Sequence, residues 1–182
     1  MFLLSVEGEK TEQQYFNMFN DKHSLVHVRC LKKRSKSAPR QTLKELERHI
    51  KKEGLHIKDE AWVIVDKDQW TDLQLMALYE WSKKKPNYYF ALSNPKFEYW
   101  LLLHFEDPGG VNSRECSERL KRHLPSYDKG IEAHHFPDEK IREAIERAKQ
   151  KDISQSNRWP AIAGTTVYRV VENILKAREQ SS

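Results

Sequence analysis

The feature that most constrains the fold of this chain is a regular alternation of apolar, strand-like runs with helical patterns through its first 105 residues. Strand-like runs occupy 2–6, 25–29, 61–65 and 88–92. Apolar side chains at helical spacing fill the segments between these runs and continue over 97–105. Strands that are separated by helical crossovers of this length usually pair in parallel. The alternation therefore predicts an α/β fold, with a largely parallel sheet flanked by helices.

The pattern changes after residue 105. Asp107-Pro108-Gly109-Gly110 interrupts the last apolar helix, and polar helical patterns then cover 113–123, 138–151 and 165–178. We expect residues 1–105 to form the α/β core. Residues 106–182 are expected to form a helical C-terminal extension packed on that core, so that the chain makes one compact unit.

The strand-like runs break off into acidic residues. Glu7 follows the first run, Asp66 and Asp68 follow the run at 61–65, and Glu98 comes just after the turn at Asn94-Pro95. In open α/β sheets ligands bind outside the carboxyl ends of the strands. Carboxylates that gather without nearby cations repel one another, and a divalent cation commonly holds them together. The sequence therefore predicts a shared crevice that holds a cation.

The spacing of the two aspartates suits Mg²⁺, with Mn²⁺ as a substitute. Asp66 and Asp68 point to the same side as long as the chain stays extended, and Mg²⁺ needs only two or three protein carboxylates because it keeps several waters. The alternative is that this Asp-x-Asp segment is only a polar turn. Glu98 also has two interpretations: an ion ligand or water-orienting group, or a favourable charge in the first turn of a helix that Asn94 caps.

A strongly basic segment follows the second run. Between residues 29 and 58 there are eleven Lys and Arg against three Glu, in a chain whose net charge is +5. The loop at its start carries five of these cations, namely Lys32, Lys33, Arg34, Lys36 and Arg40. Such a loop can neutralise the phosphates of DNA or RNA without reading sequence. The alternative is a solvated loop that only aids solubility.

Several classes of protein are disfavoured. The cysteines, Cys30 and Cys116, have neither zinc-like spacing nor a disulfide framework, so we expect a reducing, cytoplasmic location. No apolar run reaches the length of a membrane span, and neither a phosphate-binding P-loop nor a Gly-x-Ser-x-Gly nucleophile motif is present. His104, on an apolar helix, is interpreted as a core residue with a hydrogen-bonding partner.

Three segments of the chain carry a family resemblance. They are Val6-Glu7-Gly8-Glu9-Lys10-Thr11-Glu12 with Tyr15 beyond it, Val65-Asp66-Lys67-Asp68, and Ser93-Asn94-Pro95-Lys96-Phe97-Glu98 with Trp100, His104 and Phe105 beyond it. Together and in this order they resemble the RloB family, over nearly the whole chain. Its members are bacterial proteins linked to restriction and abortive phage defence, often encoded beside an AAA/ABC-type ATPase.

The resemblance implies a Toprim-like core, in which a glutamate after the first strand and a later Asp-x-Asp hold Mg²⁺ for phosphodiester chemistry. Glu7 then corresponds to the Toprim glutamate, and Asp66 and Asp68 correspond to its aspartate pair. Glu98 lies in a motif particular to the family, where the resemblance assigns no role. The segment from Trp159 to Thr166 matches the family pattern only loosely.

These observations predict a Mg²⁺-dependent nuclease of anti-phage defence, acting on DNA or RNA with an ATPase partner. Asp66 and Asp68 would hold an ion, Glu7 would complete the site as ligand or base, and Glu98 is a further catalytic candidate. The alternative is a non-catalytic module that binds nucleic acid or the ATPase. A phosphatase-like enzyme with Asp66 as nucleophile is disfavoured, because Trp70 stands where Thr or Val is expected. The sequence leaves the oligomeric state open, a homo-oligomer included.

Overall fold

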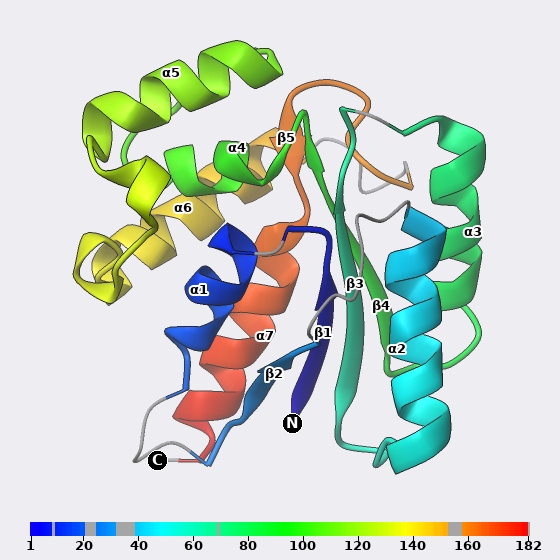
Figure 1. The fold of residues 1–182 in the computed structure, drawn as a ribbon. Helices are drawn as coiled ribbons and strands as arrows, with labels where there is room; N and C mark the ends of the chain where they lie inside the picture. Colours follow the sequence, from blue (N-terminus) through cyan, green and yellow to red (C-terminus); the bar gives the residue numbers. More distant parts are fainter. Residues whose placement is uncertain (9, 21–24, 32–38, 69, 153–157, 182) are drawn as a thin grey trace. The chain divides into compact units, whose positions relative to one another are not determined.

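The strands of the chain form a single mixed sheet. The structure, a computed structural model, describes residues 1–8, 10–20, 25–31, 39–68, 70–152 and 158–181. Its strands are β1 (Phe2–Val6), β2 (Val28–Cys30), β3 (Glu60–Asp66), β4 (Tyr88–Asn94) and β5 (Gly164–Thr165). They lie in the order β2-β1-β3-β4-β5 (Figure 1). β1 pairs in parallel with both β2 and β3, whereas β5 is antiparallel to β4. The predicted α/β fold with a largely parallel sheet is confirmed.

Helices occupy most of the predicted positions. The described helices are α1 (Thr11–Asn17), α2 (Pro39–Glu53), α3 (Asp72–Ser82), α4 (Phe97–Leu102), α5 (Ser113–His123), α6 (Asp138–Lys151) and α7 (Val167–Glu179), with the short 3₁₀ turns η1 (Tyr127–Lys129) and η2 (Ala133–His135). The bounds predicted for α5 and α6 agree with those in the structure. α2 begins at Pro39, which suits the first turn of a helix because no backbone N–H is needed there.

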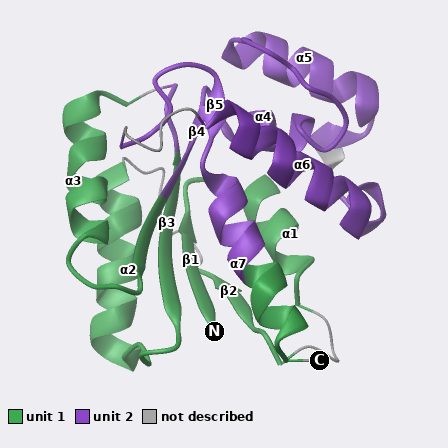
Figure 2. Ribbon diagram, turned by 180° about the vertical axis from the view of Figure 1, so that it is seen from behind, with its two compact units in different colours: residues 1–65, 70–90, 174–182 green, residues 66–69, 91–173 purple. Residues whose placement is uncertain are grey.

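The chain divides into two compact units (Figure 2). Unit 1 contains residues 1–65, 70–90 and 174–182, and unit 2 contains residues 66–69 and 91–173. The division of the chain into a core of residues 1–105 and an extension of residues 106–182 stays a prediction.

In unit 1 the strands are covered on both faces. α2 and α3 lie side by side on one face, and α1 and the last turns of α7 lie on the other (Figures 1 and 2). Every residue of β1 is buried, and so are the five central residues of β3. This explains why the five central residues of β3 are all apolar, and why β1 is apolar except for Ser5 instead of alternating. α3 begins with a capping box, in which Thr71 and Gln74 satisfy each other's backbone N–H groups.

In unit 2 the short α4 packs against α5 and α6, and β5 runs beside the end of β4. α4 is almost wholly buried, as its apolar sequence predicts. The helix predicted from residue 165 starts only at Val167, because Thr165 belongs to β5 and its hydroxyl bonds that of Ser93 at 2.8 Å. Asn94 does not cap α4 as expected: it ends β4, and Lys96 holds the N-cap position.

Candidate functional site

The first predicted strand end lies directly beside the second. Val6 of β1 is level with Ile64 of β3, and the backbone N–H of Glu7 donates to the Ile64 carbonyl oxygen at 3.1 Å. Asp66 is the last residue of β3. Because β1 and β3 are neighbours and parallel, both end at the same edge of the sheet.

The indole of Trp70 orients the carboxylate of Glu7. Its Nε1–H donates to Oε1 at 2.9 Å and to Oε2 at 3.1 Å, so one donor is shared by both oxygens. A hydrogen bond to a carboxylate favours its ionised form, which a metal ligand and a general base both require. Local sequence pattern could not reveal this pair, because 63 residues separate its members.

Gly8 and Glu12 close the turn after β1. Glu12 is 7% exposed, and its Oε1 accepts the Gly8 backbone N–H at 2.7 Å. A Cβ added to Gly8 would clash with the Glu12 carboxylate, which would have to move away from its present position. Thr11 is the first residue of α1, and Lys10 holds the N-cap position. Glu12 is thus a buried acceptor that braces the backbone next to Glu7.

The chain turns immediately after Asp66. The backbone N–H groups of Lys67 and Asp68 both donate to the carbonyl oxygen of Pro95, at 3.1 and 2.9 Å. Two consecutive N–H groups can meet one oxygen only where the backbone curls around it, whereas in a strand they point to opposite sides. The chain is therefore not extended at Lys67. An extended chain was the condition under which the side chains of Asp66 and Asp68 would point to the same side.

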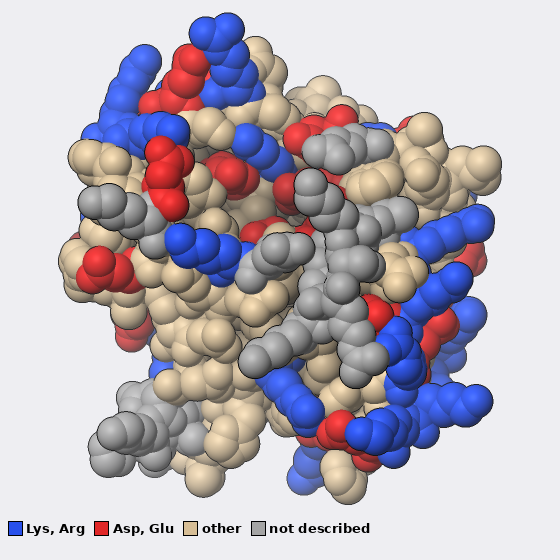
Figure 3. All heavy atoms as spheres, in the orientation of Figure 1, with Lys and Arg blue, Asp and Glu red and all other residues tan. Residues whose placement is uncertain are grey.

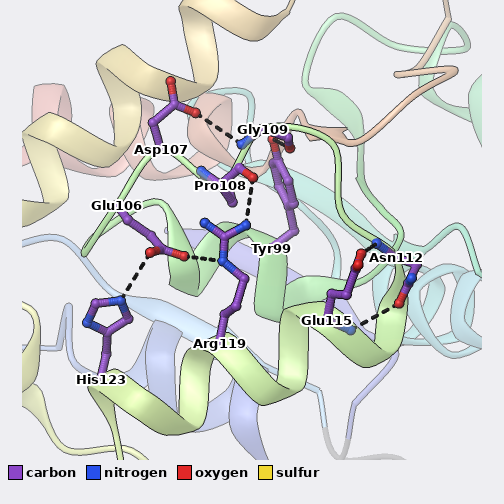
Figure 4. A network of polar contacts seen from close by, with 9 residues as sticks. All are labelled: Tyr99, Glu106, Asp107, Pro108, Gly109, Asn112, Glu115, Arg119 and His123. Atoms are coloured by element: carbon purple, nitrogen blue, oxygen red, sulfur yellow. Dashed lines mark hydrogen bonds and ion pairs between the residues drawn. The ribbon is translucent and has the colours of Figure 1, made fainter.

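Asp68 is exposed, and its Oδ2 accepts the hydroxyl of Ser113 at 3.1 Å. Ser113 is the first residue of α5, whose start is fixed by a capping box between Asn112 and Glu115 (Figure 4). The sequence pattern predicted this helix but not its contact with Asp68, which lies 45 residues earlier.

A polar network fastens the loop that precedes α5 (Figure 4). Arg119 donates to Glu106 Oε1 at 2.7 Å and to the Pro108 carbonyl oxygen at 2.8 Å. His123 approaches Glu106 Oε2 at 3.4 Å. Although burial opposes ionisation of Glu106, its bonds to Arg119 and His123 leave its pKa below the ordinary value. The network therefore fixes α5, and with it the Ser113 hydroxyl, in unit 2.

Glu98 has partners of its own in unit 2. Tyr127 Oη donates to Glu98 Oε1 at 2.9 Å, and Lys96 Nζ lies 3.8 Å from the same oxygen. Lys96 also donates to Ser117 Oγ at 2.7 Å. These contacts are sufficient for a structural role of Glu98. Its catalytic role stays a prediction.

Burial raises the pKa of the nearby Cys116 thiol to about 12, so this thiol is no nucleophile at neutral pH.

His104 is a core residue, as expected. It is 1% exposed, and its Nδ1 lies 3.0 Å from the Trp100 carbonyl oxygen and 3.2 Å from that of Leu101. Both partners are acceptors, so Nδ1 carries the proton of a neutral ring. Burial lowers the pKa of His104 to about 3. The imidazole is therefore neutral near pH 7.

The predicted nucleic-acid loop falls mostly outside the described residues. Lys32, Lys33, Arg34 and Lys36 all lie there. Arg40 is described: it is exposed and is the second residue of α2. Its place at the start of an exposed helical face makes it available to an anion.

The donors predicted for the cation are all carboxylate oxygens, the chemistry that Mg²⁺ and Mn²⁺ prefer. Within the described residues, no three His, Cys, Asp or Glu side chains form a metal-binding group. Glu7 belongs to unit 1, whereas Asp66 and Asp68 belong to unit 2. The donor set fits a hard cation, and the joint site stays a prediction.

Comparison with known proteins identifies a family. The searches of curated proteins and of solved structures found no match. Across the part of the chain that the structure describes, no helix is long and apolar enough to cross a membrane. The model of one family, described as RloB-like protein, matches residues 2–174, nearly the whole chain. That match includes β1, β3 and the segment from Ser93 to Phe105, so this chain belongs to the RloB-like family.

Proposed function

We propose that this protein is a Mg²⁺-dependent nuclease that cleaves phosphodiester bonds of DNA or RNA in bacterial anti-phage defence. The observation that supports the proposal is the parallel pairing of β1 with β3, in which Val6 is level with Ile64 and Glu7 follows directly. Membership of the RloB-like family is consistent with a role in defence. A Toprim-like core, a cytoplasmic location and an AAA/ABC-type ATPase partner complete the proposal.

Asp66 and Asp68 would hold the cation, and Glu7 would complete its ligands or act as the base that activates water. A bound Mg²⁺ would neutralise the charge of the phosphate that is attacked. The chain's own contribution is to orient Glu7, since Trp70 donates to both of its oxygens. Ser113 orients Asp68 in the same way, through a neutral donor.

The test is cleavage of labelled DNA and RNA, each with Mg²⁺, Mn²⁺ or EDTA, by the protein alone and with its ATPase partner. Glu7→Gln and Asp66→Asn should each abolish cleavage and weaken Mn²⁺ binding in calorimetry. Glu80→Gln, which removes an exposed carboxylate from α3, should leave both unchanged. A wild-type protein that cuts neither substrate under any of these conditions would overturn the proposal.

The second candidate is a non-catalytic module that binds nucleic acid or the ATPase. This candidate is favoured because acidic side chains already accept hydrogen bonds from other residues of the protein. Asp68 accepts one from Ser113, and Glu98 accepts one from Tyr127. A salt-sensitive complex that persists in EDTA, without cleavage by any preparation, would select this candidate.

A further inference from the structure

A row of cations runs along the exposed face of α2. Its members, called the α2 ridge below, are Arg40, Lys44, Arg48, Lys51 and Lys52, and all five are exposed. Positions 40, 44, 48 and 52 recur every four residues, so their side chains follow one another along one side of the helix. Figure 3 shows Lys and Arg side chains gathered over α2 and α3, at the right of the view.

The charges of the α2 ridge are largely uncompensated. Arg48 pairs with Glu45 one turn earlier. The other members have no ion pair within the part of the chain that the structure describes. Glu53, at the end of α2, is occupied by Arg29 at 2.9 Å and by His49 at 3.4 Å. Glu47 is the one acidic side chain within the exposed row, so the ridge keeps a clear excess of positive charge.

We propose that the α2 ridge binds the phosphodiester backbone of a nucleic acid without reading its sequence. The row spans twelve residue steps, or about 18 Å at 1.5 Å per residue. A strand of B-DNA carries one phosphate per about 3.4 Å of axis, so about five phosphates lie along the same length. The ridge offers five cations to those phosphates.

The other side of α2 argues against an anionic membrane as the partner. Helices that lie on membranes insert an exposed apolar face between the lipids. In α2, Leu46 is fully buried, and Leu43 and Ile50 are partly buried. Within the described residues, the exposed large apolar side chains all lie outside α2. The helix therefore presents charge and no inserting surface.

This inference deepens the proposed function, because it names the surface that would hold the substrate, and it extends beyond the loop at 32–40. It is tested by binding alone, in EDTA, so that it can stand or fall independently of cleavage. Fluorescence anisotropy would follow labelled duplex DNA and duplex RNA of arbitrary sequence between 50 and 200 mM KCl. Phosphatidylserine vesicles serve as the competing partner.

The test variant is Lys44→Gln/Lys51→Gln/Lys52→Gln. It removes three charges that have no ion pair among the described residues and leaves the Arg48–Glu45 pair intact. The control, Arg114→Gln/Lys121→Gln/Arg122→Gln, removes the same charge from α5. Each phosphate contact contributes about 0.9 to the slope of log K against log salt for B-DNA, so the test variant should lose about 2.7.

The control should keep the wild-type slope. Equal losses of slope in both variants would mean that only net charge matters. An unchanged slope in the test variant would mean that the α2 ridge does not contact the phosphates. Either result overturns the inference. Preference for vesicles over both nucleic acids overturns it as well. If Glu7→Gln binds like the wild type while no protein cleaves, the ridge stands and the nuclease proposal fails.

Discussion

The buried imidazole of His104 predicts a specific loss of stability in mild acid. In the unfolded chain this histidine takes up a proton below pH 6.5, whereas in the native state burial keeps its pKa near 3. Between these values the unfolded state binds one proton more, so the free energy of unfolding falls as the pH falls. The slope approaches about 1.4 kcal/mol per pH unit, which gives a loss of about 2 kcal/mol between pH 7 and pH 5.

The assay is urea unfolding at pH 7, 6 and 5 for the wild type and His104→Asn. The amide of Asn can donate to the Trp100 carbonyl oxygen in place of Nδ1–H, and it does not titrate in this range. The pKa of His49 is also lowered, chiefly by burial, but His49 is present in both proteins and its contribution cancels in their difference. His27→Asn, at an exposed position, is the control. If wild type and His104→Asn lose stability in parallel, the ring is protonated in the native state and the reasoning is wrong.

Two further predictions concern the turn after β1. Gly8→Ala places a Cβ against the Glu12 carboxylate and should break the Gly8–Glu12 hydrogen bond, at a cost of about 1–3 kcal/mol in urea unfolding. An equal cost in a Glu12→Ala background would show that the clash is not the cause. Trp70→Phe removes the donor that Glu7 shares between its oxygens and should lower the free energy of unfolding by about 1.5–3 kcal/mol. In nitrogen-15 spectra the Trp70 indole resonance should shift in Glu7→Gln, and an unmoved resonance would contradict the contact.

Much of the fold could be predicted because its signals are local. Continuous apolar runs marked β1 and β3, and helical spacing marked α5 and α6. β5 could not be found in this way, since two residues form a strand only through their pairing with Ser93 and Asn94. Short elements of this kind depend on a partner that is distant in the sequence, and periodicity carries no information about it.

The site was predictable only as a set of residue types at strand ends. The turn at Lys67 depends on the Pro95 carbonyl oxygen, far along the chain, so an extended Asp-x-Asp was a reasonable but incorrect expectation. The donors to Glu7, Asp68 and Glu98 come from residues 63, 45 and 29 positions away. Strand ends can be located from local pattern, whereas the groups that orient side chains there depend on tertiary contacts.

The chemistry of those donors separates the candidate ligands. Ser113 is neutral, so it orients the carboxylate of Asp68 without cancelling the charge that attracts a cation. Glu98 differs, because the ammonium of Lys96 lies 3.8 Å from its Oε1 and already supplies positive charge. A dication approaching Glu98 would have to overcome repulsion from that ammonium. If the site binds Mn²⁺, the loss of Asp68 should therefore weaken binding more than the loss of Glu98, and the reverse order would assign the 93–98 turn to the metal instead.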